Sequence, residues 1–471
     1  MQRKWQDLAP PDDPGSWYDV DGVWPTNRGS YETADFNTST DYAASAAGSV
    51  SYAFSAGVTD TSAVNREYVV TSTKIWQYDP TAGSVMTDRT GGVGVGGRGM
   101  MAQFGNATIA VMGSPLGALP GVATSYSTGG NFAALAGAPQ GNTVLIAFNA
   151  AWIFNTDTGS DCFEMSDVGD YTNWATGEWF AGQVFDGVGP INAAVEFGGP
   201  VYSFKMDSIH RHRYVGGTVK VATDQVWSGL GCGSRNAACA GATGILFQGY
   251  AKSDTGSPPV PFYWYDGVNP PVLTNPFTTI GSSSTASRIS YDVFRDIFTV
   301  WDGTALYYFS PRLMAWGRGT VQMGSSPGSL KPVLSLGMYG LRSPSPTTPS
   351  WVTPSADVLR RFSVATPGTG TSYVETTKFG TANQKLNFSR VIPRVRRLVD
   401  VGTQSEAVTA SCFRELHDTS ASSTPTYTKS ANRYRWDGMA SDNFMRFKYS
   451  ATDYDVEIDD LEPEAKPAGK N

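Results

Sequence analysis

Five short segments of this chain place an aromatic residue, an Asp and a turn residue in succession, each at the end of an apolar run. They are Tyr78-Asp79-Pro80, Phe185-Asp186-Gly187, Tyr265-Asp266-Gly267, Trp301-Asp302-Gly303 and Trp436-Asp437-Gly438. Glycine adopts positive φ without steric cost, and Asp bonds to its own local backbone, so these turns between β-rich stretches are hairpin signals. Their recurrence, with no helical stretch between them, predicts a fold assembled from antiparallel strands.

Apolar, strand-like segments recur at short intervals through the middle of the chain. Residues 143–148 and 151–154 form one pair of such segments, and residues 296–301 and 305–309 form another. Pairs of this kind return roughly every 40 to 50 residues, which is the period of a four-stranded propeller blade. The sequence therefore predicts an all-β fold containing a β-propeller of about six blades.

Four segments are expected along the chain. The polar, turn-rich residues 1–60 predict an N-terminal extended arm with one or more closing strands, and residues 61–340 are expected to hold the propeller. The proline-rich stretch within 341–372 predicts a linker or surface loop, with a helical turn at 356–361. Residues 373–471 are expected to form a C-terminal β module that ends in an acidic tail.

The composition restricts the function classes that fit this chain. Charged residues make up 16% of the 471 residues and the formal net charge is −7, which argues against a globally basic nucleic-acid-binding protein. No run of 18 apolar residues occurs, so no membrane-spanning segment is predicted. The N-terminus lacks the apolar core of a signal peptide, so we expect production in the cytoplasm without secretion.

The sequence holds no strong catalytic or cofactor motif. No Gly-x-Ser-x-Gly elbow, Walker loop or His-Glu-x-x-His pattern occurs, so no catalytic residue and no cofactor is predicted. The four cysteines are too few for a disulfide scaffold and too poorly spaced for a zinc site, so we expect reduced structural thiols. They are Cys162, Cys232, Cys239 and Cys412.

One histidine pair has the spacing of a strand-borne metal site. Residues 209–214 alternate, so His210, His212 and Tyr214 should share one strand face, with the neighbouring arginines on the other. A His-x-His pair can ligate a metal, but no carboxylate or third histidine is close in sequence. We therefore predict no metal site and expect a polar strand at a blade edge or a subunit contact.

A basic cluster lies in residues 389–397. On a strand, Arg390, Arg394 and Arg396 should project from one side, with Arg397 on the opposite side together with two valines. One interpretation is contact with a phosphate backbone or with an acidic neighbouring subunit. The other is a solvated strand face.

Three motifs in fixed order suggest a family. Residues 165–174 run from Met165 through Gly169-Asp170 to Asn173-Trp174, then Gly189-Pro190-Ile191 opens an apolar strand, and a later strand closes in residues 205–209, Lys-Met-Asp-Ser-Ile. This order resembles the β-propeller tail proteins of short-tailed phages, described as tail nozzle, tail hub or packaged-DNA stabilisation proteins. The turn-rich opening at 19–29 and the ending at 436–458 are similar to theirs as well. Tyr171 departs from the family pattern, in which Pro is expected.

The resemblance implies a structural virion protein and not an enzyme. It implies a homo-oligomeric ring, expected to be a hexamer, that lies below the portal and its adaptor proteins and contacts other tail components. The ring would retain packaged DNA and conduct it during ejection without sequence-specific binding. The protein would be made in the host cytoplasm and end in the virion tail. A wall of low charge density fits this role, because a basic lumen would hold DNA strongly.

The rival interpretation is an extracellular propeller that binds or cleaves carbohydrate, with exposed tryptophans as stacking platforms. Sialidase-type propellers carry a Ser-x-Asp-x-Gly-x-Thr-Trp turn. The nearest stretch here, residues 155–162, keeps Asp157 and Gly159 but lacks the Ser, the Thr and the Trp. The sequence favours the tail protein.

Overall fold

A computed structural model gives the fold of the chain. It describes residues 4–5, 16–21, 23–26, 30–33, 37–43, 50–56, 66–71, 73–79, 85–95, 98–113, 123–234, 237–249, 261–275, 288–292, 296–301, 306–319, 353–355, 358–363, 371–376, 378–380, 386–397, 405–414, 420–429, 436–442, 444–452 and 456–467. These residues form β-strands, turns and loops and contain no α-helix, which confirms the predicted all-β class. Within them, no helix is long and apolar enough to cross a membrane.

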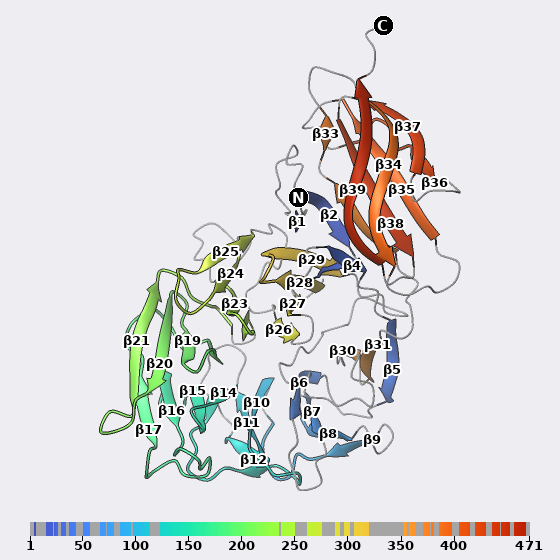
Figure 1. Cartoon of the computed structure of the whole chain (residues 1–471). Coiled ribbons are helices and arrows are strands. Elements are labelled where there is room, and N and C mark those ends of the chain that lie inside the picture. Colours follow the sequence, from blue (N-terminus) through green and yellow to red (C-terminus); the bar gives the residue numbers. More distant parts are fainter. Residues whose placement is uncertain are drawn as a thin grey trace.

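Six groups of four antiparallel strands follow one another along the described chain and are called here the first to sixth blades (Figure 1). The first blade comprises β6 (Val50–Ala56), β7 (Arg66–Thr71), β8 (Ile75–Asp79) and β9 (Val85–Asp88). The second comprises β10 (Arg98–Phe104), β11 (Ala107–Gly113), β12 (Ser125–Ser127) and β13 (Ala133–Ala134). The third comprises β14 (Gly141–Ala147), β15 (Ala150–Thr156), β16 (Gly159–Met165) and β17 (Phe180–Gln183).

The remaining three blades repeat the same order. The fourth comprises β18 (Ala193–Glu196), β19 (Val201–Phe204), β20 (Ser208–Tyr214) and β21 (Val221–Ser228). The fifth comprises β22 (Ala238–Ala240), β23 (Ile245–Gln248), β24 (Phe262–Tyr265) and β25 (Val272–Asn275). The sixth comprises β26 (Arg288–Asp292), β27 (Ile297–Trp301), β28 (Leu306–Ser310) and β29 (Ala315–Gly319).

The blades pack face to face, and the first strand of each blade contacts the first strand of the next from β6 through to β26. Strand β15 shows why the inner strands are apolar on both sides. Its residues Trp152 and Phe154 pack toward the fourth blade, while Ala151 and Ile153 pack toward the second. A strand that is buried on both faces carries apolar side chains on both, so its sequence does not alternate between polar and apolar residues. The predicted β-propeller of about six blades is confirmed by these six four-stranded blades and their face-to-face packing.

A three-stranded sheet joins residues far apart in sequence. Strand β31 (Val358–Ser363) pairs with β30 (Thr353–Ser355) and with β5 (Asn37–Ala43), which belongs to the expected N-terminal arm. The helical turn predicted at 356–361 is therefore wrong. The backbone hydrogen bonds of β31 are made with β5, a strand more than 300 residues away in sequence. Local helix or strand propensity contains no information about such a distant partner.

The C-terminal β module is built from long antiparallel strands around its own apolar residues. It comprises β32 (Thr371–Thr376), β33 (Phe379–Gly380), β34 (Leu386–Arg397), β35 (Ser405–Phe413), β36 (Thr426–Lys429), β37 (Trp436–Asp442), β38 (Phe444–Thr452) and β39 (Val456–Pro467). Phe388 lies beside Phe447, and Trp436 meets Tyr449 edge to face. Pro393 lies within β34, where it is opposite Leu461 of β39.

The N-terminal segment joins the propeller to this module. Strand β1 (Lys4–Trp5) pairs with the outer strand β29 of the sixth blade and with β2 (Ser16–Asp21), and β2 pairs with β32. Strands β3 (Val23–Pro25) and β4 (Tyr31–Thr33) pair with each other, and β4 continues onto β39. Blade and module thus share one 16-stranded sheet.

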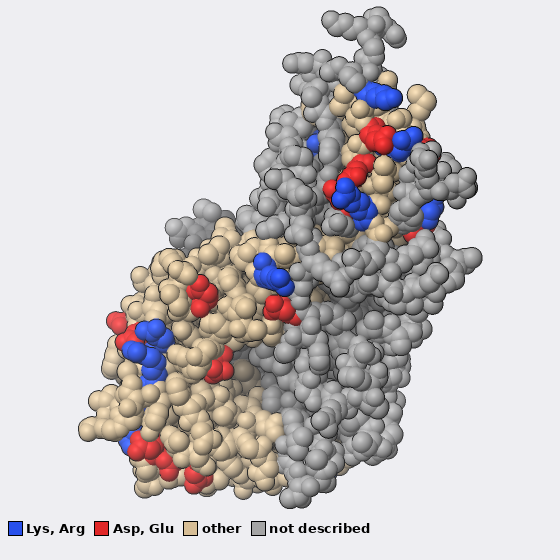
Figure 2. All heavy atoms as spheres, in the orientation of Figure 1, with Lys and Arg blue, Asp and Glu red and all other residues tan. Residues whose placement is uncertain are grey.

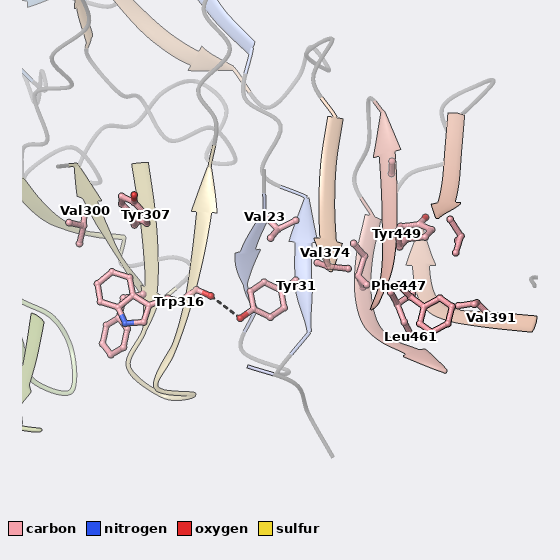
Figure 3. Packing of buried hydrophobic residues seen from close by; sticks show 14 of the residues in the cluster. Val23, Tyr31, Val300, Tyr307, Trp316, Val374, Val391, Phe447, Tyr449 and Leu461 are labelled. Carbon is pink, nitrogen blue, oxygen red and sulfur yellow. Dashed lines mark hydrogen bonds between the residues drawn. The ribbon is translucent and has the colours of Figure 1, made fainter. Parts of the chain in front are cut away.

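One apolar core follows this sheet across the joint (Figure 3). Val300 and Trp316 lie on the propeller side, Val23 and Tyr31 lie between, and Val374 begins the module side. The Tyr31 hydroxyl donates a buried hydrogen bond of 2.7 Å to the carbonyl oxygen of Trp316. The joint is therefore built like the interior of a domain and not like a flexible linker.

The aromatic-Asp turns have mixed outcomes. Tyr265-Asp266-Gly267 joins β24 to β25 as a hairpin turn, as predicted. Phe185-Asp186-Gly187 instead lies in the connection from the third blade to the fourth, and Trp436-Asp437-Gly438 lies inside β37. Pro80 and residues 302–303 of the other two segments lie outside the described residues.

Candidate functional site

The arginine cluster lies on β34 of the C-terminal module and is matched by carboxylates of the same chain. Arg390 donates to Asp437 (Nε to Oδ1, 3.2 Å) and to Glu464 (Nη1 to Oε2, 3.0 Å). The hydrogen bond with Asp437, with the charge of Glu464, raises the pKa of Arg390 above its ordinary value. Arg394 forms an ion pair with Glu462 on β39.

These ion pairs reduce the net positive charge that the arginine cluster can offer to a phosphate group or an acidic subunit. Exposed ion pairs are worth about 0 to 1 kcal/mol, so a strongly anionic partner can compete for Arg394, but the local charge is balanced. Arg390 and Arg394 lie on the outward side and Val391 is buried, as the alternation predicted. The side chains of Arg396 and Arg397 lie outside the described part, and their backbones pair with Glu457 and Val456. Subunit contact by this strand stays a prediction.

The histidine strand is enclosed between the third and fourth blades. His210 is 1% exposed and His212 is fully buried. The Nε2 atom of His212 lies 2.7 Å from Ser203 Oγ, and its Nδ1 atom lies 2.9 Å from Thr223 Oγ1. Its ring packs against Phe163 of the third blade, with centroids 4.6 Å apart.

Burial dominates the electrostatics of both histidines. It lowers the pKa of His212 from its ordinary 6.5 to about 3, with a smaller effect from His210. It also lowers the pKa of His210, and the nearby charge of Lys205 acts in the same direction. The expectation of a blade edge or subunit contact is corrected here, because the chain itself covers both side chains. Alternation placed them on one face, but it did not show that another blade covers that face.

The serine–histidine contacts do not make a nucleophile. Ser208 Oγ lies 3.0 Å from His210 Nε2, but Ser208, His210, Ser203 and His212 are all buried. A catalytic serine must reach its substrate, and its base is oriented by a third group, commonly a carboxylate. At His212 that position is taken by the Thr223 hydroxyl. In the described residues, no group of three or more His, Cys, Asp or Glu side chains could hold a metal ion.

The motif that carries the family resemblance forms a closed turn between β16 and β17. Asp167 Oδ1 accepts hydrogen bonds from the backbone N–H groups of Val168 (2.9 Å) and Glu178 (2.7 Å). Asn173 Nδ2 donates to Asp167 Oδ2, and the buried Trp174 donates its Nε1–H to the Tyr171 carbonyl. These side chains satisfy the loop's own backbone, so the motif is structural.

The fourth blade holds this loop from the side. Lys220 Nζ lies 2.8 Å from Glu178 Oε2 and donates to the Gly177 carbonyl at 2.9 Å. The Tyr214 hydroxyl donates to the same Glu178 oxygen. The Lys220 hydrogen bond, helped by that of Tyr214, lowers the pKa of Glu178. The contact therefore keeps a charged carboxylate between two blades.

The cysteines and tryptophans whose side chains are described are buried or partly buried. The four cysteines form no disulfide with one another, and burial raises the pKa of Cys232 to about 12. Of the eight tryptophans whose side chains are described, four are buried and four are partly exposed. They are Trp76, Trp152, Trp174, Trp179, Trp227, Trp264, Trp316 and Trp436.

Comparison with known proteins gives distant structural neighbours only. The chain matches no protein-family model and no curated protein in sequence. The extracellular domain of a proposed one component system from B. thetaiotaomicron is 9% identical, with a TM-score of 0.42. The match covers 75% of this chain and 45% of that one, so the chain spans less than half of this neighbour.

Two carbohydrate-active enzymes match over more of their length. An exo-β-1,3-galactanase from Phanerochaete chrysosporium is 12% identical, with 87% and 99% coverage of the two chains and a TM-score of 0.26. An exo-inulinase from Aspergillus awamori is 9% identical, with 91% and 98% coverage and a TM-score of 0.24. Similarities at this level carry nothing about the activity of this chain.

Proposed function

We propose that this chain is a structural virion protein of a short-tailed phage, a tail nozzle or hub subunit. Copies would form a ring, expected to be a hexamer, below the portal and adaptor proteins, and would retain packaged DNA and conduct it during ejection. The observation that carries the proposal is the joint between propeller and C-terminal module, in which four N-terminal strands, β1 to β4, give the two parts one sheet and one core. A conduit subunit has to keep its shape while other molecules press on it.

The side chains that could do chemistry support a passive role. His210 and His212 are buried and hydrogen-bonded to hydroxyls, and the buried Cys232 holds its proton to high pH. Arg390 and Arg394 are paired with carboxylates. The histidines and Cys232 are thus enclosed within the chain, and the charges of Arg390 and Arg394 are balanced locally by carboxylates.

The sparse surface charge also suits a conduit. Figure 2 shows a few separated charged groups on the described propeller surface, with acidic and basic groups mixed on the C-terminal module. A phosphate backbone is held by neutralising lysines and arginines, so a surface of this kind would let DNA slide past.

Light scattering coupled to size exclusion, followed by negative-stain imaging, tests the proposal. The purified chain, mixed with a portal–adaptor complex of a short-tailed phage, should give a closed ring with an open axis that docks on that complex. Replacing Arg394 and Arg396 by Ala should weaken docking while the monomer stays folded. Arg312→Ala, at an exposed turn of the sixth blade, is the matched control. A persistent monomer that binds sugars on a glycan array would contradict the proposal.

A further inference from the structure

The Asp-Gly pairs of this chain differ in how the fold holds the aspartate carboxylate. In such a pair the backbone nitrogen of Gly can attack the side-chain carboxyl carbon of the preceding Asp, since Gly has no Cβ to obstruct a close approach. Whether a pair reacts depends on how its carboxylate and its backbone are held. Three pairs have both residues in the described part of the chain, Asp186-Gly187, Asp266-Gly267 and Asp437-Gly438.

Two of these three carboxylates are held by hydrogen bonds. Asp266 Oδ1 accepts from the backbone N–H groups of Val268 (2.9 Å) and Asn269 (2.7 Å), and Asn269 Nδ2 donates to Asp266 Oδ2 at 2.6 Å. Asp437 lies inside β37, which pairs with β34 and β36, and its Oδ1 accepts from Arg390 Nε at 3.2 Å. Attack on either carboxyl carbon would first have to break these contacts.

The third carboxylate, that of Asp186, is not held in this way. Asp186 and Gly187 are both exposed, in the connection from the third blade to the fourth. Among the described residues, no hydrogen bond reaches the Asp186 carboxylate, and the backbone of residues 185–187 neither donates nor accepts one. Both reacting groups of this pair are therefore open.

The backbone around Asp186 also has room to rotate. Backbone hydrogen bonds flank the segment on each side, from the Val184 N–H to the Asp161 carbonyl at 2.9 Å and from the Val188 N–H to Asp207 Oδ1 at 2.7 Å. Between them lie three exposed residues without backbone hydrogen bonds, and such a segment opens locally at little cost in free energy. Rotation about the Asp186 main chain is what brings its carboxyl carbon to the Gly187 nitrogen.

We propose that Asp186-Gly187 is a site of spontaneous backbone modification, at which aspartate converts to isoaspartate through a cyclic imide. The Gly187 nitrogen bonds to the protonated Asp186 carboxyl group, and the nitrogen's proton leaves with the carboxyl hydroxyl as water. Water then adds to the imide carbonyl that belonged to the main chain and breaks its bond to nitrogen. The peptide link now runs through the side-chain carboxyl carbon, the mass is unchanged, and no oxidant or other co-reactant is needed.

The modification would act on the contact between the connection and the fourth blade. Isoaspartate adds one carbon to the main chain two residues before Val188. The Val188 N–H binds Asp207, and the Val188 carbonyl accepts from the Met206 N–H at 3.3 Å. Conversion would therefore displace both contacts and leave the connection more loosely held. The site does not depend on the proposed ring.

Mass-spectrometric peptide mapping of the full chain, after prolonged incubation at neutral pH and physiological temperature, tests the proposal. Isoaspartate is recognised in the digest by methyl transfer from a protein isoaspartyl methyltransferase. A synthetic peptide of residues 181–191, incubated in parallel, sets the time needed by an unconstrained chain. Conversion at Asp186 should exceed that at Asp266 and Asp437 at least about tenfold, because a charge-assisted hydrogen bond that must be broken slows a reaction by about that factor.

Two substitutions at the same position give matched controls. Asp186→Glu keeps the charge but would need a larger ring, so it should abolish the signal at 186 and leave the other two sites unchanged. Asp186→Asn, which releases ammonia in place of water, should convert faster than the wild type. Circular dichroism melting checks that each variant is folded.

Each outcome decides the question. Preferential conversion at 186 that disappears in Asp186→Glu supports the site. Equal conversion at the three pairs overturns it, because the hydrogen bonds would then not discriminate. So does an unmodified Asp186, or an unmodified Asp186→Asn variant, at a time when the free peptide has reacted, because the folded backbone would then prevent ring closure.

Discussion

The buried imidazole of His212 should make the stability of this protein depend on pH in a way that one substitution removes. In the native fold its pKa lies at about 3, against an ordinary 6.5, because burial between the third and fourth blades disfavours the charged ring. In the unfolded chain the ring is in water and takes up a proton near its ordinary pKa. Below pH 6.5 the unfolded state therefore binds more protons than the native state, and stability falls as the pH falls.

The size of the effect follows from the two pKa values. Each pH unit between them is worth about 1.4 kcal/mol. From pH 7 to pH 5 the native state should lose about 2 kcal/mol through His212, and the loss should reach about 5 kcal/mol once the pH is below 3. Well above pH 6.5 the ring is neutral in both states and contributes no pH dependence.

The comparison that isolates this term is between the wild type and His212→Gln. Gln keeps an amide donor and acceptor for Ser203 and Thr223 but does not titrate, so the variant can be less stable at pH 7 for reasons of packing alone. The informative quantity is the change in unfolding free energy between pH 7 and pH 5, measured by urea denaturation. It should be about 2 kcal/mol smaller in the variant.

His210, whose pKa is lowered by burial as well, is present in both proteins and largely cancels from the comparison. Equal pH dependence in the two proteins, or an NMR titration that places the native His212 near 6.5, would refute the reasoning about its burial.

Two further substitutions test the joint and one blade connection. Tyr31→Phe removes the buried hydroxyl and leaves the Trp316 carbonyl without that donor. The free energy of unfolding, measured in urea, should fall by about 1 to 2 kcal/mol. An unchanged unfolding midpoint would contradict the role given to this hydrogen bond. Gly187→Ala should cost at least about 1 kcal/mol, because φ is +83° and the new methyl would clash with Ser208 Oγ. Gly198→Ala, where φ is +63° and nothing lies within 4 Å, should cost less, and equal losses would show that the clash is relieved.

The sequence predicted the repeating parts of the fold and missed the parts made by distant pairing. Period-two strands and their spacing are local, so the blades around β15 could be predicted. The local sequence at 356–361 predicts a helical turn, whereas the strand β31 depends on its partner β5, which is more than 300 residues away. Residues 1–60 predict an arm with closing strands, but nothing near β1 to β4 in sequence shows that their partners are β29, β32 and β39.

For the candidate site residues too, the sequence predicted local strand geometry but not the contacts with residues distant in sequence. Alternation placed His210 and His212 on one strand face, yet which blade covers that face depends on the closure of the whole sheet array. The arginine positions on β34 were predicted, whereas the carboxylates that neutralise Arg390 and Arg394 come from β37 and β39 and meet them only in the folded module.

The N-terminal joint sets an order on how this chain can be completed during synthesis. Tyr31 leaves the ribosome early, but the strand that pairs with it contains Ile458, near the other end. At a synthesis rate of about 5 to 20 residues per second, that partner arrives on the order of 20 to 90 s later. For this interval β4 has β3 as a partner but lacks β39, so one edge of β4 stays open in the nascent chain. A truncation that removes β39 would therefore also remove the pairing partner of β4 near the other end of the chain.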